Sequence, residues 1–340
     1  IFANWYNHLS IEREIMRALL CTEWGGPEKL TIGHVPAPPM GPTQVRIGVR
    51  ACGLNFADTL MIQGLYQEKP PFPFSPGLEA AGEVLEVGAA VTHVQSGDRV
   101  AAICGHGGMA DEIVVEANTV LPIPPVMDYE TAAGFAVAYG TSHLALAHRA
   151  NLQAGEVLLV HGAAGGVGLT AVQIGKLMGA TVIATASTLQ KLALAQQAGA
   201  DHLINYSETS FRERVREITN GRGADVIFDP VGGDIFSESL RCINWEGRLL
   251  VIGFASGQIP QAPANLLLVK NISVVGLYWG AYATRNPQVL RASLSTLFDW
   301  YAAGKLSPHI SQVYPLSEAA SAFHSLMQRQ STGKLVIRVQ

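Results

Sequence analysis

The chain lacks the cysteine patterns that crosslink small secreted domains or hold a structural zinc ion. Its only cysteines are Cys21, Cys52, Cys104 and Cys242, and no two of them form a Cys-x-x-Cys pair. Such scattered residues are typical of reduced thiols and do not predict a disulfide framework or a zinc lobe. We therefore expect a cytoplasmic protein.

Long apolar runs and blocks of basic residues are also missing. No run approaches the roughly 18 apolar residues that a membrane-spanning helix needs. The 23 Lys and Arg residues against 27 Asp and Glu residues give a formal net charge of −4. Nucleic-acid-binding surfaces are basic, so the sequence predicts neither a membrane nor a nucleic acid as partner.

Residues 156–168 have the order of a buried strand, a glycine-rich turn and a helix. Val157–Val160 form a short apolar run, and the glycines that follow allow a sharp turn and the close approach of a phosphate to the backbone. Compared with the usual dinucleotide fingerprint, Ala163 replaces the first glycine. The motif predicts a dinucleotide phosphate site; a tight turn packed in an α/β core is the alternative. The expected cofactor contacts here are Ala163, Gly165, Gly166, Val167 and Gly168.

The next predicted strand indicates which dinucleotide binds. An NAD site usually has Asp or Glu at the end of this strand, whereas residues 181–185 are followed by Ala-Ser-Thr. Ser187, Lys191 and Tyr206 can bind a 2′-phosphate in the same corner, so NADPH is favoured over NADH. The alternatives are a helix N-cap for Ser187, a solvated charge for Lys191 and a packed aromatic for Tyr206.

The pattern along the chain predicts two domains. Residues 16–137 carry short strands, turns and many prolines, which indicates an irregular β-rich domain. Residues 138–278 alternate strands and helices, as in a doubly wound parallel sheet. Residues 279–340 do not extend this alternation and are expected to complete the first domain. Residues 1–15 are read as an N-terminal extension that makes a poor transit peptide. The six strands of the alternating region are expected at 157–160, 181–185, 202–205, 225–229, 248–252 and 272–277.

These features together resemble the medium-chain dehydrogenase/reductase superfamily, and within it the zinc-independent quinone oxidoreductase branch. The resemblance extends from Met16 to the C-terminus and is strengthened by residues 66–71, 245–248, 265–268 and 276–280. It implies an α/β fold in which a Rossmann domain is inserted in a split GroES-like catalytic domain. NADPH is then expected in the cleft between the two.

The resemblance also bears on metal. Zinc members carry Cys at the position of Asn55 and His at the position of Leu78, and neither present side chain can replace those ligands. Cys52 lies three positions too early. We expect no zinc.

Further site residues follow from the resemblance. Asn55, Asp58 and Tyr66 are expected to line the cleft, with Asn55 holding the nicotinamide ribose or a substrate carbonyl, and Tyr66 donating to a developing oxyanion. However, Asn55 and Asp58 are also spaced like an N-cap and its N3 partner, and Tyr66 could be a loop aromatic. The residues implied beside the nicotinamide are Thr141, Gly253, Phe254 and Ala255.

Three other polar residues are weaker candidates. His106 and His161 could act as general acids, but ordinary loop and strand-end histidines are more common. Arg285 could contact an anionic substrate, although a surface charge is the simpler interpretation.

The leading hypothesis is a zinc-independent, NADPH-dependent reductase of quinones or related conjugated carbonyls. The alternatives are an enoyl or enone C=C reductase, with a thioester as one possible substrate, and a non-catalytic NADPH-binding protein. The apolar, β-branched segment 272–278 would leave an open sheet edge, which predicts a homodimer paired through that edge.

Overall fold

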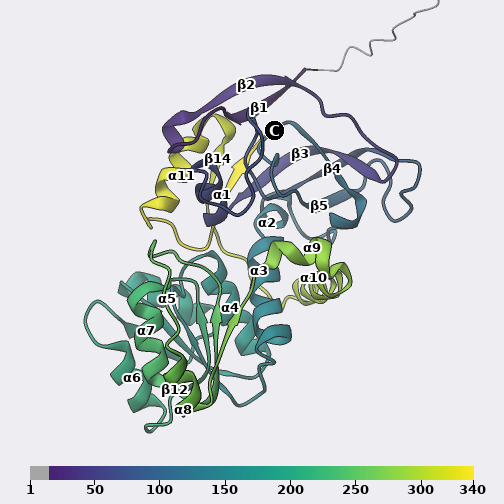
Figure 1. The fold of residues 1–340 in the computed structure, drawn as a ribbon. Helices are drawn as coiled ribbons and strands as arrows, with labels where there is room; N and C mark the ends of the chain where they lie inside the picture. Colours follow the sequence, from purple (N-terminus) through teal and green to yellow (C-terminus); the bar gives the residue numbers. More distant parts are fainter. Residues whose placement is uncertain (1–14) are drawn as a thin grey trace, which may run out of the picture.

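The computed structural model describes residues 15–340, which form two parts, each built around a β-sheet (Figure 1). One part contains a six-stranded sheet and the other a seven-stranded sheet. A separate antiparallel pair, β1 (Ile15–Cys21) and β2 (Leu30–Pro36), lies at the outer end of the second part. The predicted extension lies outside the described residues, apart from Ile15.

The six-stranded sheet has the strand order β10-β9-β8-β11-β12-β13, and every neighbouring pair in it is parallel. Numbered from β8, this order reads 3-2-1-4-5-6, which is the dinucleotide-binding arrangement. The predicted doubly wound sheet is therefore confirmed. Its strands are β8 (Val157–Val160), β9 (Thr181–Ala186), β10 (His202–Asn205), β11 (Ala224–Asp229), β12 (Ile243–Val251) and β13 (Ser273–Gly276).

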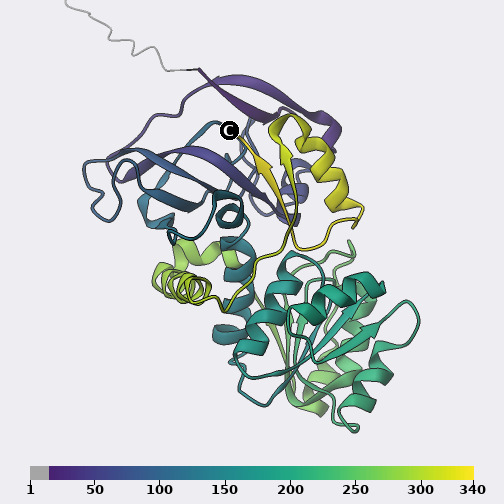
Figure 2. The same ribbon diagram turned by 180° about the vertical axis from the view of Figure 1, so that it is seen from behind.

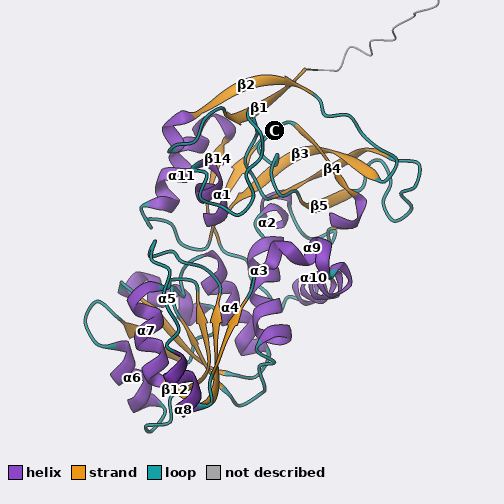
Figure 3. Ribbon diagram, in the orientation of Figure 1, coloured by secondary structure: helices purple, strands orange, loops and turns teal. Residues whose placement is uncertain are grey.

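Helices cover both faces of this sheet, and local sequence signals set their ends (Figure 3). Thr188 caps the second helix by accepting a hydrogen bond from the Lys191 backbone N–H at 3.3 Å. Gly179 follows the first helix with φ +84°, a conformation that favours glycine. The helices are α4 (Gly166–Leu177), α5 (Leu189–Gln197), α6 (Phe211–Ile218), α7 (Gly233–Cys242) and α8 (Ala264–Lys270).

Strand β12 begins five residues before the predicted start at Arg248. Its pairing with β11 shifts register after Ile243, and Glu246 has φ +59° in the irregular stretch. Regular pairing resumes at Arg248, opposite Val226. The sequence pattern thus located only the regular, buried part of the strand.

The seven-stranded sheet has the order β14-β15-β3-β4-β5-β7, with β6 paired to β3. β15 pairs antiparallel with β3, so the C-terminal segment lies beside strands from the first third of the chain (Figure 2). The return of this segment to the part that begins the chain, the second part as named above, was predicted. The strands are β3 (Gln44–Leu54), β4 (Glu79–Val87), β5 (Arg99–Ile103), β6 (Glu112–Glu116), β7 (Val120–Pro122), β14 (Ile310–Pro315) and β15 (Lys334–Arg338).

The remaining helices pack on the second part or lie between the parts. α3 runs through the boundary placed at residues 137 and 138, and α10 packs against it. Asn286 caps α10 by accepting from the Val289 N–H at 3.4 Å. These helices are α1 (Phe56–Ile62), α2 (Tyr129–Ala133), α3 (Ala136–His143), α9 (Tyr282–Arg285), α10 (Pro287–Ala302) and α11 (Ala319–Met327).

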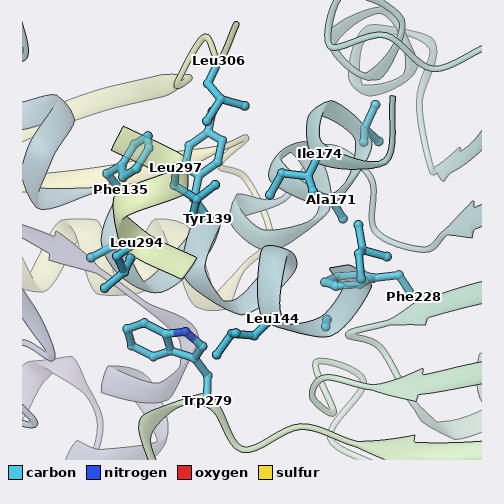
Figure 4. Close-up of a cluster of buried hydrophobic side chains, with 14 of the residues drawn as sticks. Phe135, Tyr139, Leu144, Ala171, Ile174, Phe228, Trp279, Leu294, Leu297 and Leu306 are labelled. Atoms are coloured by element: carbon cyan, nitrogen blue, oxygen red, sulfur yellow. The ribbon is translucent and has the colours of Figure 1, made fainter. Parts of the chain in front are cut away.

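A single hydrophobic cluster extends between the two sheets (Figure 4). In it, Phe135 stacks on Tyr139 at a centroid distance of 4.3 Å and on Phe298 of α10 at 5.3 Å. Leu144 and Phe228 carry the cluster toward the parallel sheet. Close-packed interiors resist the displacement of any one side chain. This cluster therefore fixes the start of α3 relative to the nucleotide-binding sheet.

Candidate functional site

The glycine turn between β8 and α4 has the geometry of a phosphate site. Gly162 has φ +57°, and its carbonyl accepts the Gly165 N–H at 2.9 Å. A Cβ at Gly168 would collide with the Gly162 carbonyl oxygen, so only glycine permits the close contact between helix and turn. The first N–H groups of α4 lack partners within the helix and are directed toward the turn.

Ala163 occupies the position of the first fingerprint glycine without disturbing this turn. Its side chain is fully buried, and its backbone N–H donates to the Thr185 carbonyl at 3.1 Å. The positive φ falls on Gly162 instead. The sharp bend is therefore supplied one residue earlier, which explains why alanine is accommodated.

A cavity of about 250 Å³ opens beside the turn. It is bounded by residues that follow the carboxyl ends of four parallel strands, where open α/β sheets bind their ligands. Of the predicted residues, Tyr206 lines it, and the side chain is 42% exposed. Its lining is His161, Gly162, Thr185, Tyr206, Val231, Gly232, Asp234, Ile235, Ser256, Gln258 and Arg329.

Ser187 and Lys191 lie at the adjacent corner, and the structure decides between two interpretations of Ser187. The cap of α5 is Thr188, so the Ser187 hydroxyl is not used as an N-cap. The Lys191 ammonium donates to the Arg329 carbonyl at 3.0 Å, which leaves further N–H groups for a ligand. No carboxylate follows β9 in the sequence to repel a phosphate.

Arg329 is a residue that sequence analysis missed. It follows α11, has φ +57°, and its guanidinium donates to the Ala255 carbonyl at 2.9 Å while lining the cavity. Its position depends on the return of the C-terminal segment across the nucleotide-binding part, more than a hundred residues from the other members of the corner. No local signal in the sequence could have indicated it.

The residues expected beside a nicotinamide lie on two elements. Thr141 is in α3 and is 8% exposed. Gly253, Phe254 and Ala255 follow β12, and the Ala255 N–H donates to the Pro230 carbonyl at 3.0 Å. Residues 253–255 thus follow the carboxyl end of a strand of the parallel sheet, whereas Thr141 lies in the helix α3.

Asn55 lies at the start of α1 in a network of buried polar groups. Its amide nitrogen donates to Glu79 Oε1 at 3.0 Å and to the Gly53 carbonyl at 3.3 Å. Its amide oxygen accepts from Lys334 Nζ at 2.7 Å. Both amide hydrogens are therefore used, and one acceptor position on the oxygen is left.

The ion pair between Glu79 and Lys334 was not anticipated from the sequence. The two side chains are 1% and 8% exposed, and Lys334 Nζ lies 2.9 Å from Glu79 Oε1. The other carboxylate oxygen accepts the Val137 N–H at 2.9 Å. The sequence offered one signal for this pair, because the acidic Glu79 directly follows Leu78, which replaces a zinc ligand in the resemblance. Its cationic partner lies 255 positions away, so the pair itself could not be predicted.

Asp58 is fully buried, and both of its oxygens accept backbone hydrogen bonds. Oδ2 accepts from Asn55 at 2.8 Å and Oδ1 from Gly77 at 3.0 Å. Burial raises the pKa of this carboxyl to about 7, although the two N–H groups and Lys334 act in the opposite direction. Asp58 therefore joins the start of α1 to the segment before β4, which fits the N3 interpretation.

Tyr66 is half-buried in the loop after α1, with its ring edge-on to Tyr278 at a centroid distance of 6.4 Å. The Tyr278 hydroxyl donates to Glu68 Oε1 at 2.9 Å, so residues after β13 contact the loop of the other part. Burial raises the pKa of Tyr66. Its hydroxyl consequently keeps its proton at neutral pH and can act as a hydrogen-bond donor.

The two candidate histidines have different surroundings. His161 is 1% exposed, its ring nitrogens contact the hydroxyls of Thr185 at 3.1 Å and Ser239 at 2.8 Å, and burial lowers its pKa to about 3. It is a neutral histidine with both nitrogens occupied, which fits the ordinary strand-end interpretation. His106 is exposed and lies edge-on to Phe74. Arg285 is exposed at the end of α9.

Among residues 15–340, no group of three or more His, Cys, Asp or Glu side chains is arranged to hold a metal ion. Cys52 is fully buried under Gly77, and Leu78 packs on the hydrophobic core of the second part. Over the same residues, no helix has the length and apolar character needed to cross a membrane.

Comparison with known proteins identifies the family. Residues 41–125 match the alcohol dehydrogenase GroES-like domain, and residues 166–296 match the zinc-binding dehydrogenase domain, a range that contains neither Asn55 nor Leu78. A quinone oxidoreductase-like protein 2 homolog from Nematostella vectensis is 45% identical over 96% of this chain and 90% of its own length. The chain belongs to the quinone oxidoreductase family of medium-chain dehydrogenases/reductases.

Solved structures of the family have the same fold. A quinone oxidoreductase from Pseudomonas syringae superposes with a TM-score of 0.90 at 33% identity, covering 95% of this chain and 99% of that one. The Escherichia coli quinone oxidoreductase complexed with NADPH gives 0.87 at 32% identity, with the same coverage. The oxidoreductase class and the Rossmann and GroES-like architecture are thus established for this family member.

Proposed function

We propose that this protein is an NADPH-dependent reductase that reduces quinones or related conjugated carbonyls without zinc. The observation that carries the proposal is the polar corner of the 250 Å³ cavity, which Tyr206 and Arg329 line and where Lys191 donates to the Arg329 carbonyl, with no carboxylate directly after β9. Two relatives support the cofactor, since the Escherichia coli quinone oxidoreductase and a mycobacterial homologue were solved with NADPH.

The chain's own groups would divide the binding of this cofactor. The N-terminus of α4 and the turn at Gly165, Gly166 and Val167 would hold the pyrophosphate. Ser187, Lys191 and Tyr206 would bind the 2′-phosphate, with Arg329 adding a fixed positive charge. Thr141 and residues 253–255 would flank the nicotinamide. When bound, NADPH supplies the hydride, and the protein supplies orientation and a water-poor cleft.

We further propose that Asn55 holds the nicotinamide ribose and does not polarise a substrate carbonyl. A carbonyl needs a hydrogen-bond donor, and both amide hydrogens of Asn55 are used within the protein. A ribose hydroxyl can donate to the remaining acceptor position. Tyr66 then becomes the proposed donor to a developing oxyanion, because burial keeps its hydroxyl protonated. Asp58 is proposed to position Asn55 and not to react.

The buried positive charge of Lys334 supports the proposed independence from zinc. The replacement of two zinc ligands by Asn55 and Leu78 supports it as well. Lys334 Nζ lies 2.7 Å from the Asn55 oxygen and 2.9 Å from Glu79 Oε1. A second cation at this position would meet a buried ammonium group, and like charges repel strongly where water is excluded.

A homodimer is proposed on the basis of the edge strand β13. It pairs with β12 on one side only, which leaves a row of backbone groups open on the other. Leu268 and Val269 in the neighbouring α8 are 76% and 65% exposed, and pairing through this edge would cover them. The cytoplasmic location stays a prediction that rests on four free thiols.

The substrate class is tested with a panel of acceptors and NADPH. Simple quinones should be reduced rapidly, and enones more slowly. Efficient reduction of enoyl thioesters with quinones inert would favour the C=C reductase instead. Tight binding of NADPH with no oxidation by any acceptor would favour a non-catalytic role.

A further inference from the structure

Lys334 is almost completely buried, and all three N–H groups of its ammonium donate hydrogen bonds. The side chain is 8% exposed, and the ammonium donates to Asn55 Oδ1 at 2.7 Å, Glu79 Oε1 at 2.9 Å and the Leu54 carbonyl at 2.9 Å. An ammonium group has three N–H donors. Its partners come from β3, the start of α1 and β4, so the group has a single, fully satisfied position.

The pair formed by Lys334 and Glu79 fixes the orientation of the Asn55 amide. Lys334 can only donate and the Glu79 carboxylate can only accept, so the amide oxygen must face Lys334 and the nitrogen must face Glu79. Without these partners only the Gly53 carbonyl, at 3.3 Å, would hold the amide nitrogen, so the amide could rotate by half a turn and present its nitrogen where the oxygen now lies. The charges thus decide whether the site offers an acceptor or a donor.

The residue before Lys334 contacts the phosphate turn. The Gly333 N–H donates to the Ala164 carbonyl at 2.8 Å, and Gly333 forms a parallel bridge with Gly165. The aliphatic part of Lys334 passes close to Gly166 at the start of α4. One dipeptide therefore touches the turn and, through a single side chain, Asn55. The turn and Asn55 are thus separated by the length of a lysine side chain. This spacing suits a cofactor whose pyrophosphate binds at the turn and whose next ribose reaches Asn55.

We propose that Lys334 and Glu79 are positioning residues that hold Asn55 as a hydrogen-bond acceptor for the nicotinamide ribose. This inference rests on the proposed function, because it requires an NADPH-type cofactor in the cleft. Lys334 does not touch the cofactor and acts through Asn55. The pair lies next to Asn55 and Leu78, which replace zinc ligands in the resemblance, because Lys334 contacts Asn55 and Glu79 follows Leu78.

The test separates positioning from simple stabilisation. Lys334→Met alone leaves the buried Glu79 carboxylate without its cationic partner and would destabilise the fold. The double variant Lys334→Met, Glu79→Met removes both charges together and replaces them with apolar side chains of similar length, so it is expected to fold. Melting temperature and circular dichroism establish that it does.

Two ligands report on different halves of the site. Adenosine 2′,5′-bisphosphate would occupy the corner with Lys191 and, through its 5′-phosphate, the glycine turn, whereas NADPH would also reach Asn55. The double variant should bind the bisphosphate as the wild type does and NADPH roughly five- to tenfold more weakly, as expected for one lost hydrogen bond. Adding Asn55→Ala to the double variant should weaken NADPH no further, because the pair acts through that amide.

Equal affinity of the double variant and the wild type for NADPH would overturn the inference, as would a full additional loss from Asn55→Ala. Either result would leave the pair as a structural ion pair only. A wild-type protein that binds neither ligand would overturn the proposed function, and the inference with it.

Discussion

Asp58 is the residue whose environment departs most from that of an ordinary carboxylate. It is fully buried and has a pKa raised to about 7 by burial. A carboxyl group with a raised folded-state pKa binds more protons in the folded than in the unfolded protein between about pH 4 and pH 7. Its contribution to stability is therefore complete below the unfolded pKa and is lost as the pH rises through 7.

The loss of this stabilisation with rising pH gives a prediction for unfolding. The free energy of unfolding should fall by up to about 2 kcal/mol between roughly pH 5.5 and pH 8 through this group alone. Asp58→Asn should be less stable overall, because an N–H loses its acceptor, but it should show a flatter pH dependence. Denaturant unfolding at the two pH values measures both effects.

Asp128→Asn is the matched control. Asp128 also accepts a backbone N–H at the start of a helix, from Thr131 at 2.7 Å, but at the surface. Because Asn caps a helix about as well as Asp, this variant should change stability little and keep the wild-type pH dependence, the stability loss between about pH 5.5 and pH 8. If Asp58→Asn keeps that dependence too, the assignment of the pKa near 7 to Asp58 is wrong.

The first turn of α5 brings together two neighbouring hydroxyls with different proposed roles. Thr188 caps the helix, whereas Ser187, directly before it, is the residue proposed to bind the 2′-phosphate. Thr188→Ala should lower stability by about 1 kcal/mol and leave the preference for NADPH over NADH unchanged. Ser187→Ala should leave stability unchanged and reduce the preference for NADPH over NADH. Each variant is the control for the other.

Melting temperatures and the dissociation constants of both cofactors decide the case. The roles are exchanged if Ser187→Ala lowers stability while Thr188→Ala abolishes the cofactor preference. A Ser187→Ala variant without any change in preference removes Ser187 from the 2′-phosphate corner.

At the level of elements, local patterns were sufficient for the parallel sheet. The run Val157–Val160 is a strand with the predicted bounds, because an apolar segment followed by a glycine turn and an amphipathic helix has few alternative structures. β12 was placed only in part, since Glu246 adopts a left-handed conformation that no propensity indicated. Local sequence thus predicts elements best where each residue has a regular conformation.

The whole molecule brings together residues that no local pattern connects. Lys334 and Arg329 reach the site because β15 returns to pair with β3 and because Arg329, just after α11, contacts Ala255 and Lys191 of the nucleotide-binding part. The resemblance named Asn55 as a cleft residue, which stays a prediction, whereas its ionic partners required the tertiary structure. The glycine turn after β8 could be located from sequence, but the groups that orient Asn55 could not.

The assembly of the molecule is tested at the exposed apolar surface of α8 beside β13. The wild type should be a dimer by light scattering at micromolar concentration. Leu268→Lys, which places a charge on this surface, should shift the equilibrium toward the monomer. Leu189→Lys is a control at a similarly exposed leucine, 71% against 76%, on a different helix. A wild-type monomer, or equal effects of the two variants, would argue against this interface.

The central claim is that hydride passes from NADPH to a quinone at a site without metal. Its most direct test is the initial rate of NADPH and NADH oxidation by a simple quinone, measured side by side before and after exhaustive removal of divalent metals by a chelator. We expect rapid oxidation, a clear preference for NADPH, and equal rates before and after chelation. Loss of activity on chelation that zinc restores, or no oxidation of bound NADPH by any quinone, would contradict it.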